Sequence, residues 1–212
     1  MKFIINNILS NGSRLIIAKL DLQIINHLDL INLNTEELEK YSSITNIKRK
    51  CEFLSIRKTI QHVFTDDEYI SYSLNGKPHL SISGHRISIS HTNGYLGIIT
   101  HPSIEVGIDL QQESPKISRI KNRFLSPKEL TSETDNEWVL LTYWCAKEAL
   151  FKYYSKGDVD FRKNLFVEPF SFNKSGIIIG EIQMPDMHKK IELQYEKIKD
   201  IMVVYTMENS SK

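Results

Sequence analysis

One stretch of this 212-residue chain is apolar on almost every side of the helix that its spacing indicates. Between Val139 and Phe151 the only charged residues are Lys147 and Glu148. A helix that is apolar all round is buried on most of its sides instead of lying on a surface. The segment therefore predicts a central helix, ending near Gly157, against which the rest of the chain has to pack.

The carboxylate of Glu148 needs a partner in that setting, because a buried charge costs several kcal/mol unless it is paired or bound to a metal. Lys152 lies one helical turn further on and offers an ion pair, but such a pair contributes only about 0.2–0.5 kcal/mol. A stronger cation beside Glu148 is the second interpretation. The helix by itself leaves both interpretations open.

The remaining segments alternate between strand and helix patterns. Strands are expected at residues 14–20, 86–90, 96–100, 106–110, 165–170, 176–182, 189–195 and 201–206. Helices are expected at 35–41 and 47–64, and capping boxes at Ser126 with Glu129 and at Thr134 with Glu137 predict two further helix starts. Because helices and strands are interspersed with hairpin-length links, we expect an α+β fold. A division near residue 104 gives two lobes, 1–104 and 105–212.

Charge and composition argue against several functional classes. The 27 Lys and Arg residues against 26 Asp and Glu leave a net charge of +1, which disfavours nucleic acid as the main partner. No segment approaches the roughly 20 apolar residues that span a bilayer, and the first residues lack the cleavage site of a signal peptide. We therefore expect a cytoplasmic protein without membrane contact. Cys51 and Cys145, far apart in the chain, are expected to be buried, inert thiols.

A strand-end carboxylate stands in the segment VGIDLQ, residues 106–111. On a strand, Asp109 and Gln111 point to one face, and Ile108 and Leu110 to the other. Oxygen ligands at two alternate positions form an edge for a hard cation such as Mg²⁺. The plainer interpretation is an Asp that caps a turn, which is common.

Two more motifs carry polar groups at turns. Ser90, His91 and Thr92 end the strand expected at 86–90, where they could donate hydrogen bonds to phosphate oxygens, although a plain surface histidine is the simpler interpretation. The second motif is Asn75-Gly76-Lys77-Pro78, which by itself indicates only a turn.

The order of the motifs is more informative than any one of them. A basic helix with FLSIRK is followed by NGKP, SISHT, VGIDLQ and WCAKEALFK, between Arg49 and Gly157. This series resembles the 4′-phosphopantetheinyl transferase superfamily, and within it the larger, pseudo-dimeric type that activates carrier proteins. The resemblance implies a monomer of two similar α+β lobes, with coenzyme A in the cleft between them. It implies Mg²⁺-dependent transfer of the 4′-phosphopantetheine arm to a serine of an apo acyl or peptidyl carrier protein, releasing 3′,5′-ADP.

The resemblance also implies residue roles around the reacting phosphates. Asp109 would be a magnesium ligand, Glu148 a second ligand and the base, and Lys152 the contact to the pyrophosphate. Many relatives have a second acidic residue two positions after the Asp, where this chain has Gln111. Gln offers an oxygen without a negative charge, so we expect weaker metal affinity with activity retained.

The remaining implied roles concern the nucleotide part of coenzyme A. Ser90 and His91 match the pair that approaches the 3′-phosphate, and Arg57 matches a helix arginine that serves the same group. Lys77 and Pro78 correspond to the segment beside the adenine.

Other functions fit parts of the pattern. A metal-dependent nuclease would use Asp109, Glu148 and a lysine, but such nucleases need Glu and Lys two residues apart on one strand. A coenzyme A or carrier-protein binding module without catalysis is the alternative that Gln111 suggests. The basic segment 116–124 is either a solvated helix face or a surface that steers an acidic carrier protein.

Overall fold

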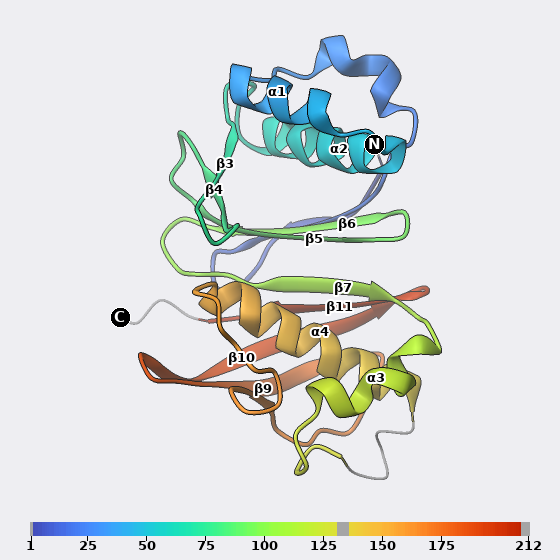
Figure 1. The fold of residues 1–212 in the computed structure, drawn as a ribbon, viewed down its shortest axis with the longest axis vertical. Helices are drawn as coiled ribbons and strands as arrows, with labels where there is room; N and C mark the ends of the chain where they lie inside the picture. The colour runs from blue at the N-terminus through green and yellow to red at the C-terminus, as the bar shows by residue number, and fades with distance from the viewer. Residues whose placement is uncertain (1, 131–135, 209–212) are drawn as a thin grey trace.

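The computed structural model describes residues 2–130 and 136–208, which form two antiparallel sheets (Figure 1). The first sheet has the strand order β1-β2-β6-β5-β4-β3. Its strands are β1 (Lys2–Ile8), β2 (Arg14–Lys19), β3 (Ile70–Tyr72), β4 (Pro78–Leu80), β5 (Arg86–Thr92) and β6 (Tyr95–His101). The second sheet has the order β7-β11-β10-β9-β8. Its strands are β7 (Ile108–Gln112), β8 (Leu165–Val167), β9 (Ser175–Met184), β10 (Met187–Ile198) and β11 (Ile201–Thr206).

The helices are η1 (Ile24–Leu30), α1 (Thr35–Ser43), α2 (Ile47–Val63), α3 (Lys116–Phe124) and α4 (Glu137–Tyr154). Figure 1 shows α1 and α2 on the first sheet and, in the other half of the molecule, α4 against the second sheet, with β7 and β11 above the helix and β9 below it. The first sheet lies beneath α1 and α2, and α3 and α4 lie on the second sheet. The predicted α+β class is confirmed.

Strand β11 of the second sheet is buried on both faces. Met202 and Val204 belong to the apolar cluster around α4. Ile201, Val203 and Tyr205 alternate with them and belong to a cluster that includes strands β2 and β6 of the first sheet. The period of two along a strand therefore assigns one set of residues to α4 and the other to the contact between the sheets.

Strand β7 follows the alternation that the sequence predicts. Ile108 and Leu110 are buried in the apolar cluster between the sheets. Asp109 lies between them in sequence and makes its contacts on the other side, with α4. The prediction that Asp109 and Ile108 face opposite ways is confirmed.

Helix α4 approaches β7 unusually closely at Gly107, the residue before the strand. A Cβ atom built there would lie 2.0 Å from the carbonyl oxygen of Ala149. No side chain fits at that distance, so glycine is the residue that permits this packing. The close approach brings the turn of α4 that contains Glu148 and Lys152 next to β7.

The predicted helix start at Ser126 is wrong for the described residues 126–130, which form a turn. Half of the expected capping box is present, because the backbone N–H of Ser126 donates to Glu129 Oε2 at 2.7 Å. The same oxygen accepts from Lys147 Nζ at 2.7 Å. Glu129 thus forms an ion pair with Lys147, a buried lysine of α4.

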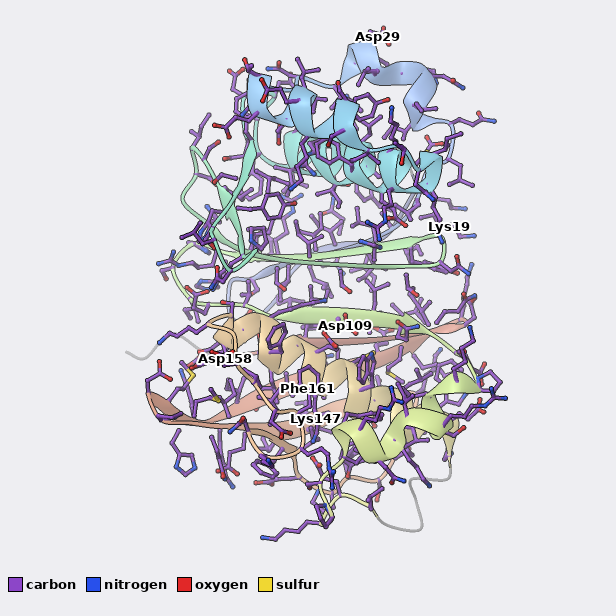
Figure 2. The ribbon with its side chains drawn as sticks, in the orientation of Figure 1. Lys19, Asp29, Asp109, Lys147, Asp158 and Phe161 are labelled. Carbon is purple, nitrogen blue, oxygen red and sulfur yellow. The ribbon has the colours of Figure 1, made fainter. Side chains whose placement is uncertain are left out.

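Lys147 is fully buried, with 0% of its surface exposed. Besides Glu129, its ammonium donates to the carbonyl oxygens of Phe124 at 2.8 Å and Phe161 at 2.9 Å. Figure 2 shows Lys147 and Phe161 at neighbouring positions at α4. All three donors of the ammonium are satisfied, which makes this burial tolerable and ties α4 to two loops.

Two further differences concern the ends of elements. Helix α4 is capped by Asn136, whose side chain accepts from the N–H of Trp138 at 2.9 Å. The predicted cap at Thr134 lies outside the described residues. Strand β1 was not predicted, because Asn6 and Asn7 interrupt its apolar pattern; pairing with β2 supports it nevertheless.

Both cysteines are buried and free, as expected. Within 2–130 and 136–208, none of the helices combines the length and apolar character that crossing a bilayer requires.

Replacing Gly107 by Ala should lower the free energy of unfolding by about 3 kcal/mol, because the new methyl group would collide with backbone atoms of α4. Urea denaturation measures this change. Gly97→Ala is the control, since the methyl group there would meet the end of the Leu110 side chain, which can move, at 2.2 Å. An equal or smaller loss at Gly107 than at Gly97 would contradict the importance of the close approach.

Candidate functional site

Asp109 lies at the junction of the two sheets and α4 (Figure 2). Its carboxylate oxygen Oδ1 accepts from Lys152 Nζ at 2.7 Å and from Ser90 Oγ at 2.6 Å. The side chain is buried, with 6% of its surface exposed. Lysine from α4 and serine from β5 therefore hold this carboxylate from two different elements.

Lys152 connects α4 to the backbone of β7 as well. Its ammonium donates to the carbonyl oxygen of Ile108 at 3.0 Å. Lys152 thus forms its ion pair with Asp109 and not primarily with Glu148, its neighbour one turn earlier. Of the two interpretations of Glu148, the simple pair within the helix is not the one that this geometry favours.

Glu148 is half-buried on α4. Burial raises the pKa of its carboxyl group to about 7, the negative charge of Asp109 adds to that rise, and the positive charge of Lys152 opposes it. Two carboxylates that repel each other in a partly dry site are stabilised when a cation joins them. The two acidic residues that the sequence singled out therefore share one electrostatic environment.

Two cavities adjoin β5 on either side of Ser90. The first, of about 180 Å³, is lined by Lys77, Pro78, Phe151 and Lys152, together with residues 87–89. The second, of about 570 Å³, is lined by residues 91–93 and 111–114 and by basic residues. Since Ser90 binds Asp109 directly, the acidic site lies between the two cavities.

All four residues of the NGKP motif line the first cavity. The side chain of Asn75 donates to the carbonyl oxygen of Ser155, which follows α4, so the turn bridges the two halves of the molecule. The ammonium of Lys77 pairs with Glu105. The sequence alone indicated only a turn, and the structure brings that turn to the end of α4.

The second cavity is mainly polar and carries positive charge at its wall. Three basic side chains line it together with two acidic ones, so that the basic ones are in excess: Lys48, Arg49 and Lys116 against Glu52 and Glu113, with His91 and Gln111 beside them. His91 lies 3.6 Å from Glu52, measured from Nδ1 to Oε1. An anionic group of phosphate size is the kind of ligand that such a wall attracts.

Arg57 does not reach either cavity, contrary to the role that the resemblance implied. Its side chain has 2% of its surface exposed, and Nε lies 3.2 Å from Glu37 Oε1. The guanidinium carbon lies 3.4 Å from the centre of the Phe53 ring. Arg57 stabilises the packing of α1 on α2, because the helix turns it inward.

Arg49 is the arginine of α2 that faces the second cavity. It lies near the N-terminus of the helix, two turns before Arg57, and the sequence pattern did not distinguish the two. Their difference in burial depends on where η1 and α1 cover α2. Local spacing contains no signal for that.

The residues of this site fit a divalent cation in part. Glu148 carries a carboxyl group whose pKa is raised by a second carboxylate, the electrostatic condition that a cation relieves. Within the described ranges no group of three His, Cys, Asp or Glu residues could hold a metal by itself. Asp109 and Glu148 would need the amide oxygen of Gln111, ligand oxygens or water to complete the shell.

Glu148→Gln should stabilise the ligand-free protein at pH 8 by on the order of 1–3 kcal/mol, because it removes a carboxylate charge that burial and Asp109 disfavour. The folded state holds a proton on Glu148 up to about pH 7, whereas the unfolded chain loses it near the ordinary value of 4.5. The loss of folding stability caused by Glu148 therefore grows as pH rises from 4.5 to 7 and is complete above 7.

Urea denaturation of both proteins at pH 5, 6, 7 and 8 in the presence of a chelator tests this. The gain should be largest at pH 8 and vanish towards pH 5. Glu192→Gln, at an exposed position of β10, is the control and should show no such trend. A gain of equal size at pH 5 and pH 8 would show that Glu148 is not perturbed.

Comparison with known protein families found a match for one part of the chain. Residues 105–202 match the family model of the 4′-phosphopantetheinyl transferase superfamily, and this part contains β7, α3 and α4 and ends in β11. The match includes Asp109, Glu148 and Lys152 but not the NGKP and SISHT motifs. A search of curated proteins found no match.

Proposed function

We propose that this chain is a magnesium-dependent 4′-phosphopantetheinyl transferase of the larger, pseudo-dimeric type, with lobes at 1–104 and 105–212. The observation that carries the proposal is the meeting of Asp109, Lys152 and Glu148 where the two sheets and α4 join. The superfamily domain at 105–202 supports it, since that family implies coenzyme A, Mg²⁺ and a carrier protein in general.

Coenzyme A would lie along the groove formed by the two cavities. Its adenine would occupy the smaller one, beside Lys77 and Pro78. The 3′-phosphate would take the polar wall of the larger one, with His91 and Arg49 as its contacts. The diphosphate would then lie near Lys152, which already bonds to Asp109.

The proposed reaction joins the serine oxygen of the carrier protein to the β-phosphorus of coenzyme A. The bond from that phosphorus to the bridging oxygen breaks, and 3′,5′-ADP leaves with the electron pair. Phosphoryl transfer of this kind depends mainly on positioning and charge stabilisation, so no covalent enzyme intermediate is required. Lys152 supplies fixed positive charge beside the leaving group.

Glu148 is suited to accept the serine proton. A base is most effective when its pKa is close to the working pH, and in the site without a cation the pKa of Glu148 is raised to about 7. A bound cation would lower this pKa. Asp109 and Glu148, with Gln111, would hold Mg²⁺, which when bound supplies Lewis-acid stabilisation of the charge on the diphosphate. Without the cation, Lys152 neutralises Asp109.

The apo carrier protein would dock near α3. This helix exposes Lys116, Arg119 and Arg123 and buries Ile117 and Phe124 against the core. Carrier proteins are generally acidic, and opposite charges raise the rate of encounter. Lys116, the first residue of α3, also lines the second cavity.

Glu148→Ala and Asp109→Asn should each reduce transfer at least about 100-fold, because one removes the proposed base and both weaken the cation site. Apo acyl or peptidyl carrier protein, coenzyme A and Mg²⁺ are incubated with each variant, and the carrier is weighed by mass spectrometry. Glu192→Ala, at an exposed position, is the control. Near-normal transfer by Glu148→Ala would remove the proposed base.

The wild-type protein is tested in the same assay with several carrier proteins. Binding of coenzyme A without transfer to any of them would favour a binding module that lacks catalysis. Circular dichroism of each variant shows whether a loss of transfer reflects loss of the fold.

Gln111→Glu should lower the Mg²⁺ concentration that gives half-maximal transfer, by about tenfold, because a third negative charge strengthens a site for a hard cation. Titration of Mg²⁺ against the initial rate measures this. Gln194→Glu on β10, outside the site, changes the net charge equally and is the control. An unchanged metal requirement in Gln111→Glu would show that position 111 does not contact the metal.

A further inference from the structure

The middle of strand β5, residues 87–90, is buried or half-buried on both faces, although its alternating sequence predicts a strand with one face exposed. Ile87 belongs to the apolar cluster beneath α2, and Ile89 packs against that cluster. Ser88 and Ser90, on the opposite face, have only 3% and 6% of their surfaces exposed. A face of buried hydroxyl groups needs hydrogen-bond partners.

Those partners are backbone groups of β7 in the other sheet. Ser88 Oγ accepts from the N–H of Ile108 at 3.1 Å. Ser90 Oγ accepts from the N–H of Leu110 at 3.4 Å. Thr92 continues the series, since its Oγ1 accepts from the N–H of Gln112 at 3.3 Å. Each step is two residues on both strands, so the hydroxyls of β5 act as a ladder of acceptors.

The position of β7 explains why these N–H groups are available. In the described part of the second sheet, β7 is an edge strand that pairs with β11 alone. Alternate N–H groups of an edge strand point away from its only neighbour and would be left unpaired. The hydroxyl ladder satisfies them and fixes the register between the two sheets.

Ser90 differs from Ser88 in one respect. Its hydroxyl also donates to Asp109 Oδ1 at 2.6 Å. A serine hydroxyl has a single proton, so this donation leaves none for another acceptor. Lys152 donates to the same oxygen from α4 at 2.7 Å, and the two donors together restrict the rotation of the carboxylate.

We infer that Ser90 is a positioning residue, which orients the Asp109 carboxylate through the hydroxyl ladder and does not bind the 3′-phosphate of the nucleotide. The inference rests on the proposed function for its effect on transfer, but the hydrogen bond itself is independent of it. The orientation of the Asp109 carboxylate would thus depend on the register between the two sheets, because Ser90 bonds to both Asp109 and the backbone of β7. This replaces the role that the family resemblance implied for this residue.

A double-mutant cycle tests the contact in protein free of metal and ligand. The urea midpoints of wild type, Ser90→Ala, Asp109→Ala and the double variant are compared, with Ser88→Ala in place of Ser90→Ala as the matched control. Both serine variants lose one bond to β7, but only Ser90→Ala loses the bond to Asp109. Because alanine at position 109 offers no acceptor, the midpoint shift caused by Ser90→Ala should shrink in the Asp109→Ala background, and the shift caused by Ser88→Ala should not.

Kinetics test the consequence for transfer. Ser90→Ala should lower kcat on the order of tenfold, as loss of a hydrogen bond to a charged group does, with the KM for coenzyme A within about threefold. Ser90→Thr, which keeps the hydroxyl group, should restore kcat. A raised KM with unchanged kcat would instead show that Ser90 binds the nucleotide and would overturn the inference.

The two experiments separate the inference from the proposed function. If wild-type protein transfers nothing, the proposed function fails, and the double-mutant cycle still decides whether Ser90 and Asp109 are coupled. Additive midpoint shifts for Ser90→Ala and Asp109→Ala would overturn the inference even if the protein is an active transferase.

Discussion

The packing of strand β7 is the constraint on which the rest of the site depends. On one side, Gly107 lets the backbone of α4 approach so closely that no Cβ atom fits between them. On the other side, hydroxyl groups of β5 accept the N–H groups that the edge strand would leave unpaired. Asp109 lies between these two contacts. A displacement of either sheet would therefore move its carboxylate away from Lys152 or from Ser90.

Charge balance in the site follows from this packing. One ammonium, that of Lys152, serves two carboxylates in a partly dry environment, and it bonds to Asp109. Glu148 is left with a raised pKa. The site is thus short of positive charge in the absence of a ligand, which is the physical basis for proposing that a divalent cation completes it.

A second buried ion pair has a different part in the fold. Lys147 is adjacent to Glu148 in sequence, but its ammonium is fully satisfied by Glu129 and two carbonyl oxygens. It ties α4 to the loops on the far side from β7 and so limits rotation of the helix about its axis. Two neighbouring charges on one helix therefore serve stability and the candidate site separately.

Local patterns in the sequence determined most of the elements and the acidic residues of the site. The central helix, α2, β5 and β7 were predicted because their periodicities reflect which faces are apolar, and Asp109 and Glu148 stood out as charges in apolar surroundings. Tertiary structure decided what no local pattern contains: β1 forms by pairing with β2, Glu129 pairs Lys147 instead of starting a helix, and Arg57 is buried against Glu37 while Arg49 faces a cavity. It also decided that the serines of β5 meet β7. The reason is physical, because the partner of a polar side chain depends on which distant segment packs against it, and spacing along the chain specifies only the direction in which that side chain points.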